Sequence, residues 1–110
     1  MGKAGLLGEL EQLVMLATLR LDGAAYAVPI LDELQSKTGL KLSRGSIYVT
    51  LDRLEQKGYL ESWFAEPTPE RGGKAKRFFR LTALGAEALR RSRSALMKMW
   101  EDQEPALEEL

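Results

Sequence analysis

The sequence predicts a mostly α-helical fold with one small β-hairpin, in the order helix, helix, helix, hairpin, helix. Apolar residues recur at three- and four-residue steps through three segments before residue 58. Two aromatic-rich segments follow, separated by two prolines and a Gly-Gly pair, and a long helical pattern comes last. A hairpin directly after the third helix is winged helix-turn-helix topology, here extended by a long C-terminal helix.

Glycine, proline and capping residues divide the helical part of the sequence. The first helix is expected over residues 6–21, where its apolar coverage exceeds the needs of one small core, so part of it should face another chain. The second helix is expected from Ala25 to Lys37, closed by Gly39. The third should begin at an N-cap on Ser43 and end at Gly58. Its apolar line consists of Ile47, Leu51 and Leu54.

The two strands of the hairpin are expected over residues 59–65 and 74–81. Thr82 is a natural N-cap for the last helix, which should continue until Pro105 interrupts it. A chain of 110 residues forms a single unit of ordinary size. Within it we expect a winged helix-turn-helix part over residues 1–81 and a dimerisation helix with an acidic tail over residues 82–110.

The composition argues against an enzyme and against a membrane protein. The chain has no cysteine and no histidine, so thiolate chemistry, the usual zinc ligands and the commonest general base are missing. No apolar run is long enough to span a membrane, and the first residues lack the pattern of a secretion signal. We therefore expect a cytoplasmic, non-enzymatic protein with no cofactor and no metal site.

Charge is unevenly distributed along a chain whose net charge is zero. Residues 41–80 hold nine basic and five acidic side chains, whereas residues 99–110 hold five acidic and no basic ones. Such an asymmetry can focus a positive field locally despite overall neutrality. A set of solvated charged faces is the simpler alternative, which composition alone leaves open.

The third helix carries a polar, basic stripe beside its buried one. A rotation of about 100° per residue places Ser46, Thr50, Arg53 and Lys57 on this stripe. The helix N-terminus, with Ser43 and Arg44, offers backbone N–H groups to a phosphate or a base edge. An ordinary solvated amphipathic helix would show a similar pattern. The expected tip of the hairpin favours DNA contact, because a basic wing beside such a helix can clamp phosphates. Its basic residues are Arg71, Lys74, Lys76 and Arg77.

The segment from Gly45 to Leu60, GSIYVTLDRLEQKGYL, resembles the signature of PadR-family transcriptional regulators. Phe78-Phe79-Arg80-Leu81-Thr82 and Gly85 are similar to the family's wing return and last-helix start, so the resemblance covers most of residues 8–89. It implies that Ser46, Tyr48 and Thr50 face DNA, with Arg53 supporting them from the next turn. The chain departs from the family in having Val49 after the motif tyrosine, where proline is frequent, and Ala25-Tyr26 in place of a Gly-Tyr pair.

The last helix carries more apolar side chains than the chain can cover, so a second copy is expected to cover them. The residues assigned to this dimer interface are Leu10, Leu13, Leu89, Leu96, Met97 and Trp100. The resemblance implies pairing through the first and last helices, repression of a promoter operator, and release by a small aromatic or hydrophobic effector. Met97 and Trp100 are the candidate effector pocket, with simple interface packing as the alternative. A winged-helix module that binds a partner protein instead of DNA is the competing function.

Overall fold

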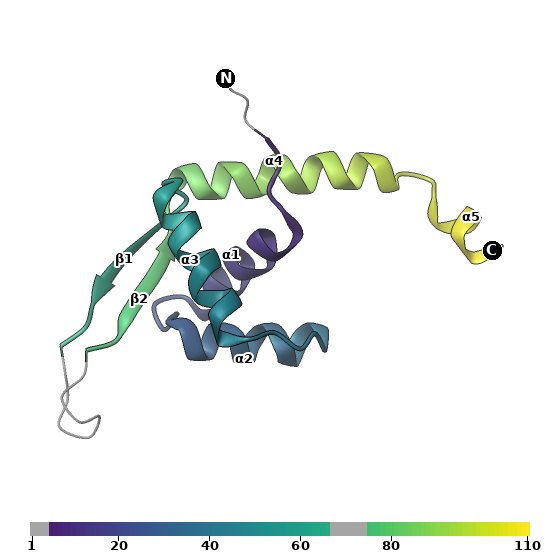
Figure 1. The fold of residues 1–110 in the computed structure, drawn as a ribbon. Helices are drawn as coiled ribbons and strands as arrows, with labels where there is room; N and C mark the ends of the chain where they lie inside the picture. The colour runs from purple at the N-terminus through teal and green to yellow at the C-terminus, as the bar shows by residue number, and fades with distance from the viewer. Residues whose placement is uncertain (1–4, 67–74) are drawn as a thin grey trace.

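The protein was analysed as a computed structural model, which describes residues 5–66 and 75–110. The elements follow the predicted order. They are helices α1 (Glu9–Leu21), α2 (Ala27–Thr38) and α3 (Arg44–Gln56), strands β1 (Leu60–Phe64) and β2 (Arg77–Leu81), and helices α4 (Ala83–Trp100) and α5 (Glu104–Glu108). Helices α1, α2 and α3 gather on one side of α4, which runs past them and carries α5 at its far end (Figure 1). The predicted mostly helical winged fold is confirmed.

Side chains from α1, α2, α3 and the hairpin form one core. Val14 and Met15 of α1 meet Ile30 of α2, Ile47 of α3 and Phe79 of β2, all almost completely buried. The predicted apolar line of α3 is confirmed, because Ile47, Leu51 and Leu54 are among the most deeply buried side chains. This packing fixes the orientation of α3 and therefore decides which of its other faces meets solvent.

The caps of α3 and α4 agree with the sequence. The Ser43 hydroxyl accepts a hydrogen bond from the Ser46 N–H at 3.1 Å, and the Thr82 hydroxyl accepts one from the Gly85 N–H at 3.0 Å. Gly39 and Gly58 both adopt a positive φ, a backbone conformation that often follows a helix and that costs glycine little energy. The C-cap residue of α3 is nevertheless Lys57, one residue before Gly58.

Both ends of the chain differ from the predicted helices. Helix α1 begins at Glu9 rather than residue 6, because the Glu11 carboxylate accepts a hydrogen bond from the Gly8 N–H at 2.9 Å and so caps the helix there. Helix α4 ends at Trp100, before Pro105, since Glu101 leaves helical backbone geometry and Asp102 has a φ of 62°. Pro105 instead lies in the first turn of α5, where proline is tolerated.

The hairpin is antiparallel and shorter than predicted, with Leu60 opposite Leu81 and Phe64 opposite Arg77. The Phe79 N–H also bonds the Ala25 carbonyl at 2.8 Å, which ties β2 to the segment before α2. The wing therefore starts from a base anchored to two parts of the core. Among the helices of the described ranges, none has the length and apolar character required to cross a bilayer.

Candidate nucleic-acid interface

Helix α3 turns a face away from the core, and this face differs from the one expected. The exposed side chains along it are Arg44, Tyr48, Val49, Asp52, Arg53 and Gln56. Tyr48 and Val49 are each more than half exposed. Sequence reasoning missed Val49, Asp52 and Gln56 as surface candidates, although they lie opposite the line of Ile47, Leu51 and Leu54 on a helical projection.

Thr50 was expected to face DNA, and the structure contradicts this expectation. Its side chain is 3% exposed, and its hydroxyl donates a hydrogen bond to the Ser46 carbonyl at 2.8 Å. The buried stripe of α3 is wider than the three apolar residues indicated, because the short threonine side chain satisfies its own hydroxyl within the helix. Thr50 therefore stabilises the position of α3 and has no group free for a base.

Lys57 was also expected at the DNA surface, and in the structure its ammonium forms an ion pair within the protein. Lys57 Nζ lies 2.7 Å from Glu11 Oε2, which joins the C-terminal end of α3 to the first turn of α1. Burial raises the pKa of the Glu11 carboxyl, but the hydrogen bonds from Lys57 and the Gly8 N–H and the charge of Arg53 outweigh it. The net pKa lies below its usual value, so the carboxylate stays ionised and holds Lys57.

Arg77 was expected to contact DNA from the wing, and in the structure its guanidinium is bound to α3. Its guanidinium pairs with Glu55 and, at 3.2 Å, with Asp52 Oδ1, while its Nε donates to Ser62 Oγ at 3.2 Å. The Ser62 hydroxyl in turn donates to Glu55 at 2.6 Å. This network, called here the Arg77 network, consists of Asp52, Glu55, Ser62 and Arg77. It joins both strands of the wing to α3 through charge-assisted hydrogen bonds.

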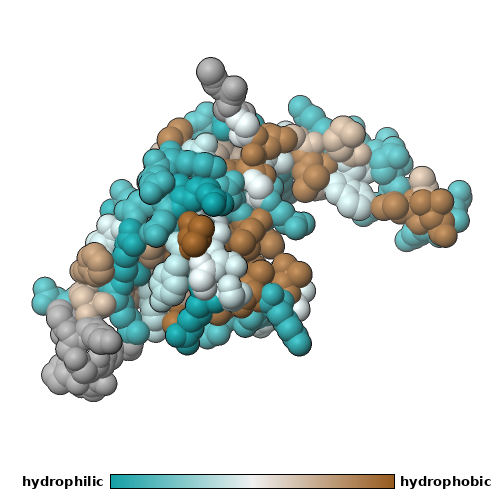
Figure 2. Space-filling view, viewed as in Figure 1, coloured by the Kyte–Doolittle hydropathy of each residue, from teal (hydrophilic) through white to brown (hydrophobic). Residues whose placement is uncertain are grey.

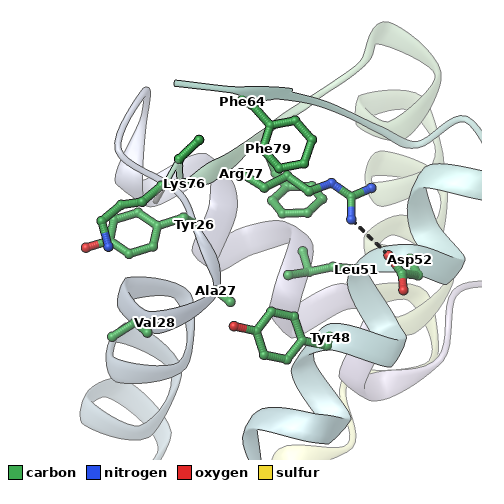
Figure 3. A pocket seen from close by; sticks show the side chains of 11 residues that line it. Tyr26, Ala27, Val28, Tyr48, Leu51, Asp52, Phe64, Lys76, Arg77 and Phe79 are labelled. Carbon is green, nitrogen blue, oxygen red and sulfur yellow. Dashed lines mark hydrogen bonds and ion pairs between the residues drawn. The ribbon is translucent and has the colours of Figure 1, made fainter. Parts of the chain in front are cut away.

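A cleft of about 400 Å³ separates the wing from α3 and the start of α2 (Figure 3). Tyr48, Asp52, Phe64 and Arg77 are among the residues that line it. Lys76 directly precedes β2, at the end of the hairpin far from α4, and lies over the ring of Tyr26 at 4.2 Å, so an aromatic face holds this cation. Of the predicted wing cations, Arg71 and Lys74 lie outside the described residues.

The remaining predicted residues of the recognition surface gather at the start of α3. Ser43 and Ser46 lie within hydrogen-bonding distance of each other, 2.9 Å between their hydroxyl oxygens. Arg44 and Tyr48 are exposed beside them, and Arg53 is exposed nearly two turns further along. The structure therefore brings four of the predicted residues together at the start of α3 and leaves Arg53 exposed in the last turn of the same helix.

A second surface of interest lies along α1 and α4. Leu16, Leu19, Leu96 and Met97 line an apolar groove of about 310 Å³ between the two helices. Apolar side chains continue along the outer half of α4 and onto α5 (Figure 2). Of the predicted interface residues, Leu10, Leu13 and Leu89 pack partly against the core of their own chain, whereas Leu96, Met97 and Trp100 are largely exposed.

Sequence reasoning did not select Leu16 and Leu19, which face outward from α1. The sequence did indicate an exposed apolar surface on this helix, because its apolar face is wider than one small core needs. Met97 and Trp100, the candidate effector residues, line a shallow depression together with charged side chains that include Arg90, Arg93 and Glu104.

Comparison with known proteins is consistent with this geometry. The family model described as the transcriptional regulator PadR-like family matches residues 15–91. No curated protein sequence matches the chain. Among solved structures, the chain is similar to a PadR family transcriptional regulator from Eggerthella lenta, with 25% identity, 91% of this chain and 87% of that chain covered, and a TM-score of 0.69.

Two further solved structures have the same fold. A PadR-like transcription factor from Bacteroides fragilis shares 25% identity over 91% of this chain and 87% of its own, with a TM-score of 0.63. A PadR family transcription regulator from Clostridium difficile shares 19% identity over 91% of this chain and 99% of its own, with a TM-score of 0.71.

Proposed function

The chain belongs to the PadR-like family of transcriptional regulators, and from that premise we propose that it is a homodimeric repressor that binds a promoter operator through α3 and the wing. It is a DNA-binding regulator and not an enzyme, as the family establishes. Its expected place of action is the cytoplasm, where it meets double-stranded DNA.

The exposed start of α3 carries the DNA-contact proposal. The first turn of a helix presents backbone N–H groups and a partial positive charge, which suit a phosphate. Ser43, Arg44, Ser46 and Tyr48 surround this turn, and Arg53 extends the surface along the same helix. These side chains offer hydroxyl and guanidinium donors of the kind that read base edges and hold phosphates. Lys76, a cation of the wing that lies over the Tyr26 ring, would add a phosphate contact beside this helix.

The homodimer proposal is supported by the apolar surface of α1 and α4. Leu16, Leu19, Leu96 and Met97 form an apolar groove on the outside of the chain, and Met99 beyond them is 77% exposed. An exposed surface of this kind marks an interface in a monomer of this size. A second copy related by a two-fold axis would cover it and would place two α3 helices for a two-fold related operator.

The third part of the proposal is release by a small aromatic or hydrophobic effector. It rests on Met97 and Trp100, whose side chains line the same depression at the outer end of α4. If planar hydrophobic compounds leave the fluorescence of Trp100 unchanged in the DNA-bound dimer, this part of the proposal is wrong. Trp63, in the wing, is the internal reference, and its fluorescence is measured separately in a Trp100→Phe variant.

The experiment that tests the DNA function is binding of the full chain to the DNA upstream of its own gene and of neighbouring genes, across a range of salt concentrations. Phosphate contacts give an affinity that falls linearly with salt on logarithmic axes. Arg44→Ala and Arg53→Ala should each lower the affinity and reduce the salt slope by about one. Arg20→Ala is the matched control, because Arg20 lies on α1 and pairs with Glu33 at 2.6 Å.

Binding that is independent of salt and of DNA sequence would contradict operator recognition. It would favour the competing function, in which the same face of α3 binds a partner protein.

A further inference from the structure

Asp52 is an unexpected residue on the outward face of α3, the helix proposed to read the operator. It lies midway along α3, between the exposed residues Tyr48 and Gln56, and its own side chain is 59% exposed. A carboxylate beside DNA phosphates is electrostatically unfavourable unless it gains a specific partner. A base that donates a hydrogen bond to the Asp52 carboxylate would supply such a partner.

We propose that Asp52 is a specificity-determining residue whose carboxylate accepts a hydrogen bond from the N4 amino group of a cytosine in the major groove. The inference rests on the proposed operator recognition by α3. Among the base edges of the major groove, cytosine presents an amino donor with no acceptor on the same base, whereas adenine places its N7 acceptor beside its amino group. A carboxylate can only accept, so cytosine is the base that fits it.

The Arg77 network keeps the carboxylate in position for this contact. Arg77 Nη1 lies 3.2 Å from Asp52 Oδ1, and the guanidinium reaches across the cleft to α3 (Figure 3). Arg77 is itself held by Glu55 and Ser62, so it is not free to swing away with Asp52. The pairing limits the rotamers of Asp52 and leaves Oδ2 available to a base. The guanidinium also offsets part of the repulsion between the carboxylate and the phosphates.

Glu55 shows that anchoring the wing does not itself require Asp52. Glu55 bonds both Arg77 and Ser62, and its side chain is 31% exposed, about half the exposure of Asp52. The two carboxylates share one guanidinium, but only Asp52 points from the face that carries Tyr48 and Gln56. Glu55 thus holds the wing, whereas the carboxylate of Asp52 remains at the surface.

Asp52 also acts against the wrong bases. Opposite thymine or guanine, the carboxylate would meet the acceptor atoms O4, O6 or N7 and gain no hydrogen bond. Discrimination then comes from repulsion at those bases as well as from attraction at cytosine. We expect one position in each half-site where cytosine is preferred by about tenfold.

The test compares the base preferences of the wild-type chain, Asp52→Asn and Glu55→Gln, each used to select sites from a randomised duplex library. Asparagine pairs with the N7 and N6 of adenine, so Asp52→Asn should move one position per half-site from cytosine to adenine. Glu55→Gln is the matched control, because it weakens the same Arg77 network from the other side. It should lower affinity for all sequences without changing the preferred base at that position from cytosine to adenine. Asp52→Ser should lose the preference at that single position and bind unselected DNA more tightly.

Thermal unfolding shows whether each variant is folded. If Asp52→Asn is unstable, Asp52→Ser is the second variant that tests this exposed site. The proposal is overturned if Asp52→Asn and Asp52→Ser keep all wild-type base preferences while the wild-type chain selects a defined site. That result would leave operator recognition by α3 intact. A wild-type chain that selects no site would overturn the proposed function and this inference together.

Discussion

Lys57 Nζ lies 2.7 Å from Glu11 Oε2, and this ion pair joins two helices whose residues are 46 positions apart in the chain. Glu11 is 9% exposed and also accepts the Gly8 N–H that caps α1. One carboxylate therefore begins the first helix and holds the end of the third. Since α1 contributes to the apolar groove and α3 to the proposed DNA-contact surface, the pair links the two surfaces for which functions are proposed.

Glu11→Gln should destabilise the fold by about 1 kcal/mol at neutral pH, a modest cost because Lys57 is partly exposed and the glutamine can still cap α1. The pKa of Glu11 is lowered in the folded chain from an ordinary value of 4.5. Its stabilisation is therefore present above pH 4.5 and is lost as the pH falls through the lower pKa of the folded state. Chemical denaturation at several pH values measures this difference.

Glu9→Gln is the matched control for that change, because Glu9 lies in the same first turn and is exposed. Its effect on stability should be small throughout. A difference between wild type and Glu11→Gln that persists unchanged well below pH 4.5 would show that charge is not its cause.

Gly85→Ala should destabilise the fold by about 3 kcal/mol through overpacking. A Cβ at Gly85 would overlap the backbone carbonyl oxygen of Tyr59, which belongs to the rigid entry into β1. Thermal or denaturant unfolding measures the loss. Gly45→Ala is the comparison, since the nearest atom to its added Cβ is Ser43 Oγ at 3.8 Å and alanine favours helix by about 0.5 kcal/mol or more. Equal stability of the two variants would mean that α4 does not pack this closely on Tyr59.

Thr50→Val should leave DNA affinity unchanged, because the threonine hydroxyl is buried and bonded to the Ser46 carbonyl. Tyr48→Ala, two residues earlier and on the exposed face, should lower affinity by about tenfold. Titration of each variant against the same operator fragment gives both values. A large loss of affinity in a stable Thr50→Val protein would restore Thr50 to the recognition surface.

Leu16→Glu should convert the proposed dimer to a folded monomer, because a carboxylate in the apolar groove would be buried without a partner. Sedimentation velocity or light scattering measures the mass. Leu40→Glu is the control, because Leu40 has a similar exposure and lies outside the groove in the segment between α2 and α3. If Leu16→Glu and wild type have the same mass, the groove between α1 and α4 is not the interface.

Much of the fold could be predicted because its signals are local. The apolar line of α3, the caps at Ser43 and Thr82 and the glycine at position 39 depend on neighbours within a few residues, and each was predicted. The start of α1 and the end of α4 could not be predicted as accurately from the sequence. The cap at Gly8 depends on the rotamer of Glu11, and the end at Trp100 depends on backbone geometry that Pro105 does not dictate.

The sequence by itself determined the kind and order of the elements and the concentration of cations around α3 and the wing, because periodicity and composition are properties of the chain. Only the tertiary structure decided which of those cations are free. Lys57 is bound by Glu11, and Arg77 by Asp52, 25 residues away, since the packing of α3 against α1 and the wing brings these charges together. Burial of Thr50 and exposure of Asp52 follow from the same packing, because the rotation of α3 about its axis is set by the core it covers.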